Sequence, residues 1–161
     1  MSDDVNKKQA LILVDRAYRH QMKGEYGPAI FLFKRSLTLW PTAEAYTYLG
    51  WTYGMLNRYD EAIACCKDAI EIDPTFGNPY NDIGTYLIEL HQWEEAIPWL
   101  EKALQATRYE SPQFPHLNLG RAYEHLGRYR LALQYFDQAL EIDPYYQAAI
   151  WAKYKLLSRL N

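Results

Sequence analysis

The stretch YTYLGWTYGMLNRYDEAIACCKDAIEIDP, residues 46–74, carries the pattern that decides the fold. Large side chains recur at every third or fourth position on both sides of Asn57-Arg58, which predicts two amphipathic helices joined by a short turn. Small residues stand on these two faces at Gly50 and Ala62. Because two helices approach closely only where their facing side chains are small, this pair predicts the crossing point of an antiparallel helix pair.

The same order of residues returns along the chain. Gly50, Gly84 and Gly120 lie 34 and 36 residues apart. Three units also close on a proline, and these prolines are Pro41, Pro74 and Pro144. A repeated order of aromatic residue, Leu-Gly, Tyr, Ala, aromatic residue, Ala and Pro with this period resembles the tetratricopeptide repeat (TPR) family. The resemblance implies an all-α fold, a right-handed α-solenoid of four TPR helix pairs followed by a C-terminal capping helix.

The repeat spacing sets the expected domain organisation. We expect residues 1–9 to form a flexible N-terminus and residues 10–161 to form a single TPR domain. The repeats are expected at about 10–42, 43–76, 77–112 and 113–146, with the capping helix at 147–161. The third repeat is two residues longer than its neighbours, either because its second helix continues or because the loop around residues 107–112 bulges. The last segment repeats the first-helix pattern at Ile150, Tyr154 and Leu157, so it is expected to cover the open apolar face of the fourth repeat.

Composition and charge exclude several classes of function. The chain of 161 residues has a net charge of −3, and its basic residues are scattered, so no nucleic-acid-binding face is predicted. No apolar run reaches the ~18–20 residues of a membrane span, and the acidic start lacks a secretory signal pattern. The two cysteines, Cys65 and Cys66, are neighbours on one predicted helix and point about 100° apart, so a disulfide between them is not expected. We therefore expect a cytoplasmic protein.

The sequence offers no constellation for catalysis, for a metal or for a cofactor. The four histidines have no His-x-x-x-His spacing, and Cys-x-x-Cys is absent. Neither a glycine-rich phosphate loop nor a Gly-x-Ser-x-Gly nucleophile elbow occurs. We expect no enzyme, no cofactor and no metal site.

In the TPR family, the first helix of each repeat lines a concave groove that holds a peptide from a partner. Counting within each repeat places a set of residues there, and from it we select a candidate peptide-binding groove: Tyr18, Met22, Thr47, Trp51, Met55, Asn78, Asn81, Thr85, Arg121 and His125. The set is more apolar than a solvated face requires, and such a stripe is typical of a binding surface. An alternative remains open, because a tight superhelix would bury some of these side chains against neighbouring first helices. For Phe114 and Leu117 the two readings are evenly balanced.

The chemistry of this set indicates a protein or peptide partner. Aromatic side chains anchor a partner, and methionine adapts to it. Asn78 and Asn81 offer hydrogen bonds to the main chain of an extended peptide, and Arg121 offers a cation for a carboxylate. The chaperone-binding members of the family grip a C-terminal carboxylate with lysine and arginine. Their positions here hold no lysine or arginine in either possible frame, so a heat-shock-chaperone tail is not the expected ligand.

We therefore expect a non-enzymatic protein-interaction module, an adaptor or an assembly chaperone. The alternative is a self-associating structural scaffold, in which Trp151 and Tyr154 of the capping helix pack on another copy. A weaker resemblance links the chain to bacterial TPR pilotins and assembly proteins, because these also lengthen the junction before a late repeat, here at residues 109–112.

Overall fold

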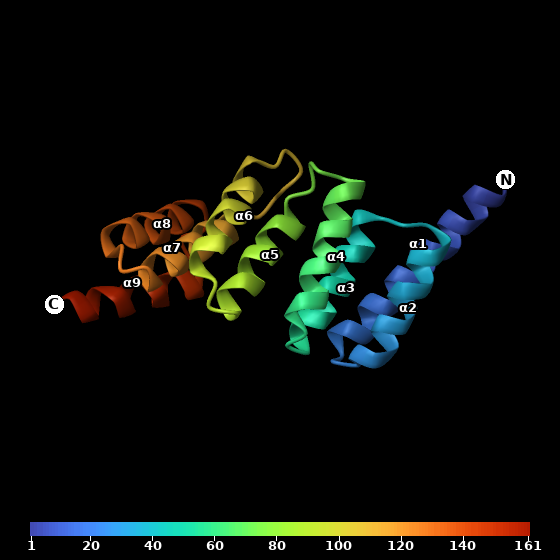
Figure 1. The fold of residues 1–161 in the computed structure, drawn as a ribbon, viewed down its shortest axis with the longest axis horizontal. Helices are drawn as coiled ribbons and strands as arrows, with labels where there is room; N and C mark the ends of the chain where they lie inside the picture. Colours follow the sequence, from blue (N-terminus) through green and yellow to red (C-terminus); the bar gives the residue numbers. More distant parts are fainter. The chain divides into compact units, whose positions relative to one another are not determined.

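The computed structural model describes residues 1–161, and its regular elements are nine α-helices. They are α1 (Ser2–Met22), α2 (Tyr26–Leu39), α3 (Ala43–Met55), α4 (Tyr59–Ile72), α5 (Asn78–Glu89), α6 (Trp93–Gln105), α7 (Gln113–His125), α8 (Tyr129–Ile142) and α9 (Gln147–Leu160). The expected all-α fold of four helix pairs and a last single helix is thus confirmed (Figure 1). The chain divides into two compact units, unit 1 (Met1–Pro79) and unit 2 (Tyr80–Asn161).

Unit 1 contains the helix pairs α1–α2 and α3–α4, and α2 packs against α3. The predicted crossing point in the second pair is confirmed. A Cβ atom added to Gly50 would lie 3.0 Å from the carbonyl oxygen of Ala62 and 3.3 Å from Cys66 Sγ. Cys66 itself is fully buried, as a small apolar core residue. The absence of a side chain at Gly50 therefore sets how closely α3 and α4 approach.

The turn inside each helix pair contains one residue with left-handed backbone. In the first and fourth pairs this residue is a glycine, Gly24 or Gly127, with φ of 75°. In the second and third pairs Asn57 and His91 take the same role with φ of 59°. His91 is exposed, as expected for a residue that replaces a turn glycine. A side chain in this region costs backbone strain that glycine avoids.

Helix α1 differs from the expectation that residues 1–9 are flexible and that the first helix begins near Ala10. The helix begins at Ser2. Asp3 and Asp4 lie in its first turn, where acidic side chains interact favourably with the helix dipole, and the Lys8 ammonium lies 3.1 Å from the Asp4 carboxylate one turn earlier. Polar composition alone therefore misplaced the helix start by about two turns.

Unit 2 contains the pairs α5–α6 and α7–α8 and the final helix α9. An added Cβ at Gly84 would meet Leu100, and one at Gly120 would meet the Phe136 ring, so both pairs repeat the close crossing. Pro98 lies inside α6, which continues past it. The longer third repeat is explained by a loop, because α6 ends at Gln105 and α7 begins at Gln113.

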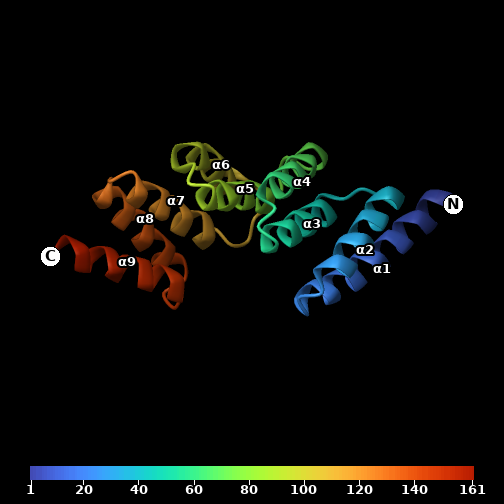
Figure 2. The same ribbon diagram turned by 60° about the horizontal axis from the view of Figure 1, so that its bottom comes forward.

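Helix α9 packs against α8 and α7, as expected for a cap (Figure 2). The residues it buries are Ala149 and Leu156, in one core cluster with Phe136 and Leu117. Of the residues that the sequence pattern pointed to, Ile150 and Leu157 are half-buried, whereas Tyr154 is 62% exposed and does not cover the fourth repeat. The position of Tyr154 corresponds to Gly84 and Gly120, which lie close to the second helix of their own pairs.

Candidate partner-binding surfaces

Four residues of the predicted groove lie on α1 and α3, the first helices of the two pairs in unit 1. Tyr18 and Met22 lie one turn apart on α1, and Trp51 and Met55 lie one turn apart on α3. Their exposed fractions are 40%, 61%, 38% and 48%, respectively. We call these four residues the aromatic–methionine patch. Large apolar side chains left this exposed on first helices are available to a partner.

The backbone under this patch is held by a buried polar contact between α1 and α3. The Gln21 side chain is 2% exposed, and its Nε2 donates to the Tyr48 carbonyl oxygen at 2.9 Å and to Thr52 Oγ1 at 2.8 Å. The rings of Tyr18 and Tyr48 also contact each other, with centroids 5.4 Å apart. These contacts hold α1 against α3, the two helices that carry the patch.

Two other predicted groove residues, Thr47 and Asn78, lie outside the patch, and only Asn78 is exposed. Thr47 is 6% exposed and its hydroxyl donates to the Ala43 carbonyl oxygen at 2.7 Å. The Thr47 hydroxyl thus makes a hydrogen bond within α3. Asn78 is exposed as the first residue of α5.

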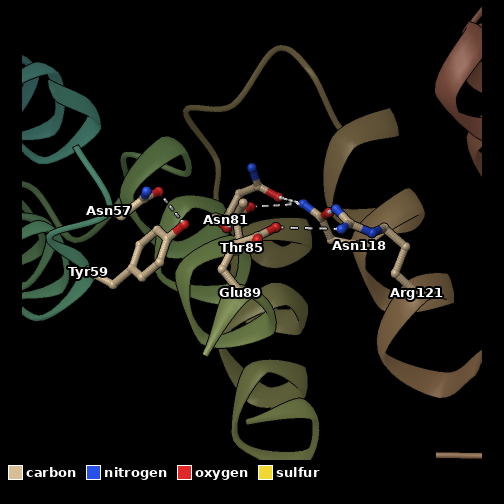
Figure 3. A network of polar contacts seen from close by, with 7 residues as sticks. All are labelled: Asn57, Tyr59, Asn81, Thr85, Glu89, Asn118 and Arg121. Carbon is tan, nitrogen blue, oxygen red and sulfur yellow. Dashed lines mark hydrogen bonds and ion pairs between the residues drawn. The ribbon is translucent and has the colours of Figure 1, made fainter. Parts of the chain in front are cut away.

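In unit 2, a network of hydrogen bonds connects α5 and α7 (Figure 3). Asn118 Nδ2 donates to Asn81 Oδ1 at 3.1 Å and to Thr85 Oγ1 at 3.0 Å. Arg121 Nη1 donates to Asn118 Oδ1 at 3.5 Å, and Arg121 Nη2 lies 3.6 Å from Glu89 Oε1. We call these five residues the Asn118 network. Three of them, Asn81, Thr85 and Arg121, were selected from the sequence.

The network is buried at one end and solvated at the other. Asn81 and Asn118 are 8% and 7% exposed, whereas the side chains of Arg121 and Glu89 are 40% and 45% exposed. The buried amides satisfy each other, as buried polar groups must. The cation at the solvated end is the group that a partner can reach.

His125 differs from the other predicted residues, because its ring is stacked on Trp93 of α6. The ring centroids are 3.9 Å apart and the planes are nearly parallel, at 2°. Burial lowers the pKa of the His125 imidazole, and the positive charges of Arg121, His91 and Arg159 lower it further, against the opposing effect of Glu124. His125 is therefore a packed side chain at the edge of this surface, and its imidazole becomes positively charged only at acidic pH.

A second group with a shifted pKa, the Asp82 carboxyl, is hydrogen-bonded to Asn81 of the network. Enclosure by protein raises the pKa of the Asp82 carboxyl to about 7, although a hydrogen bond from Asn81 opposes the shift. Burial also raises the pKa of Tyr109, in the loop between α6 and α7, and the nearby Asp82 carboxylate adds to this shift.

The structure holds no group of three or more His, Cys, Asp or Glu side chains that could bind a metal ion. No helix combines the length and apolar character that a membrane crossing requires.

Asn118 is the residue that the sequence analysis did not select. It lies three residues before the predicted groove residue Arg121, at the position that holds Asp15, Tyr48 and Asp82 in the other repeats. The available signal was that no repeat places an aliphatic side chain there. A buried asparagine at such a position needs partners, and those partners are the predicted groove residues.

Paired helices with small residues at each crossing, together with side chains presented from the first helices, define a helical-repeat interaction protein. A tetratricopeptide repeat family model matches residues 43–76, and a second one matches residues 76–144. The chain therefore belongs to the tetratricopeptide repeat family. TPR repeats mediate protein–protein interaction, and TPR domains bind protein or peptide partners.

Similarity to individual proteins is lower. The "Small glutamine-rich tetratricopeptide repeat-containing protein 2" of Mycosarcoma maydis is 28% identical over 101 residues, which are 56% of this chain and 29% of that protein. The chain thus spans less than a third of this relative.

Two solved structures of pilus proteins share the fold. Pseudomonas aeruginosa PilF has a TM-score of 0.87 at 20% identity, over 99% of this chain and 71% of that chain. PilW, a type IV pilus biogenesis factor, has a TM-score of 0.81 at 24% identity, over 87% of this chain and 64% of that one.

Proposed function

We propose that the protein is a non-enzymatic adaptor or assembly chaperone that binds a peptide segment of a partner on its first helices. The observation that carries this proposal is the aromatic–methionine patch, whose four large apolar side chains are 38–61% exposed. Exposed apolar surface that is concentrated on one face typically marks an interaction site. Aromatic anchors and adaptable methionines are the side chains that such sites favour.

The experiment is selection from a random 12-residue peptide display library, followed by fluorescence anisotropy with a selected peptide. Trp51→Ala should weaken binding at least tenfold, because a central aromatic anchor typically contributes more than about 1.4 kcal/mol. The matched control is Phe31→Ala, which removes an aromatic ring that is 65% exposed on the second helix α2. Equal peptide affinity for wild type and Trp51→Ala would remove the patch from the proposal.

A second candidate is a self-associating scaffold, and the exposure of α9 supports it. Trp151 and Tyr154 of α9 are 73% and 62% exposed. Sedimentation velocity distinguishes the candidates, because a scaffold forms larger species as its concentration rises. A cytoplasmic location is also a proposal, supported by the buried side chains of Cys65 and Cys66, which form no disulfide and suit a reducing compartment.

A further inference from the structure

The long contacts of Arg121 are the starting point for a further inference, which rests on the proposed function. Its two contacts, 3.5 Å to Asn118 Oδ1 and 3.6 Å to Glu89 Oε1, are much longer than the ~2.7–2.9 Å of a charge-assisted hydrogen bond. A guanidinium carries five N–H donors in a planar fork. Arg121 therefore keeps most of its capacity to bind an anion.

Asn118 determines where this guanidinium lies. Both contacts of Asn118 Nδ2 are to α5, so the amide orientation is fixed and Oδ1 faces Arg121. Because Asn118 is 7% exposed and its partner Asn81 is 8% exposed, the arrangement is held inside the protein rather than by solvent. Figure 3 shows the Arg121 side chain extending from α7 toward α5, between Asn118 of α7 and Glu89 of α5.

The positive charge of Arg121 acts on groups beyond Glu89. Burial raises the pKa of the Tyr146 hydroxyl, and the charge of Arg121 opposes this rise; burial lowers the pKa of His125, and the charge of Arg121 lowers it further. The Phe114 ring packs edge-on against Tyr146, with centroids 5.5 Å apart, and Phe114 is itself 39% exposed. The cation therefore lies in a partly apolar surrounding, where a carboxylate beside an apolar side chain would find both kinds of contact.

We propose that Arg121 binds an acidic side chain of the partner segment, and that Glu89 occupies Arg121 in the free protein as an internal competitor. Glu89 is the last residue of α5 and its side chain is 45% exposed, so it can leave for water at small cost. The incoming carboxylate replaces a 3.6 Å contact with a bidentate pair at ordinary hydrogen-bond length. Asn118 is the positioning residue that keeps the fork in place during this exchange.

The test is the same library selection, run in parallel on wild type, Arg121→Gln, Glu89→Gln and the control Glu95→Gln. Glu95 is an exposed carboxylate on the second helix α6, so its variant makes the same change of net charge away from Arg121. Peptides selected by wild type should carry Asp or Glu at one fixed position. A selected peptide and its Asn or Gln version are then compared by fluorescence anisotropy.

Glu89→Gln should bind the acidic peptide about threefold to tenfold more tightly than wild type and leave the amide version unchanged. Arg121→Gln should lose the preference for the acidic peptide, and Glu95→Gln should match wild type. Selected peptides without an acidic position, or equal affinity of the acidic peptide for wild type and Glu89→Gln, would overturn the inference while the proposed function stands. A selection that yields no binding peptide from any variant would overturn both.

Discussion

At the scale of single residues, Asn118 is the buried polar residue that joins α7 to α5. Asn118→Ala should lower the free energy of unfolding by about 1–3 kcal/mol, because it removes the amide that satisfies Asn81 Oδ1 inside the protein. Urea unfolding followed by circular dichroism measures the loss. Ser158→Ala is the control, since that hydroxyl bonds to its own helix in an exposed place, and it should change stability by less than about 0.5 kcal/mol.

Asp82 gives the protein a predicted pH dependence. Its pKa is about 7 in the folded protein, against the ordinary 3.8, so the folded state holds a proton that the unfolded chain releases. Stability from this group is complete below about pH 4, decreases as the pH rises and is lost above about pH 7. Asp82→Asn should therefore be more stable than wild type at pH 8, on the order of 4 kcal/mol, and similar to it near pH 4.

Urea midpoints of both proteins at pH 4, 6 and 8 test this prediction about Asp82. Asp3→Asn, at an exposed position in the first turn of α1, serves as the control. Parallel pH profiles of wild type and Asp82→Asn would contradict the raised pKa.

At the scale of elements, the helix pairs are what the sequence predicted best, because the crossings of the second, third and fourth pairs each use a residue without a side chain. Gly120→Ala should cost about 1–3 kcal/mol, since the new methyl group would meet the Phe136 ring, which is fully buried and cannot move aside. The matched control is Gly27→Ala near the start of α2, where an added Cβ meets nothing within 4 Å. That change should be neutral or slightly stabilising, and thermal unfolding of both variants compares them.

The two terminal helices were harder to predict, and for different physical reasons. The start of α1 depends on exposed charges and a dipole interaction, and apolar periodicity does not record these. Helix α9 keeps the pattern of a first helix, yet only residues facing the preceding pair are buried, such as Ala149 and Leu156. Periodicity indicates which residues share a helical face, but it does not show whether another helix covers that face.

At the scale of the whole molecule, the sequence predicted which positions belong to the candidate site. It predicted less well which of their side chains are accessible to a partner. The repeat register located the exposed side chains of Trp51 and Met55 correctly. It did not distinguish an accessible polar residue from one used within the fold, as Thr47 shows by bonding to Ala43. Nor did it indicate that Asn81 lies in a buried network, because a contact between repeats depends on residues 37 positions apart.

The oligomeric state is the last prediction, and it follows from α9. Tyr154 lies 34 residues after Gly120, at the position where the second and third helix pairs have Gly50 and Gly84. An added Cβ at Gly84 or Gly120 already meets the facing helix, so a tyrosine ring at this position prevents a second helix from packing on α9 in the same way. A neighbouring copy therefore cannot extend the array by adding its helix there. We expect sedimentation velocity to show a 19.0 kDa monomer whose apparent mass does not rise with concentration, and an increase that Trp151→Ala abolishes would favour the scaffold instead.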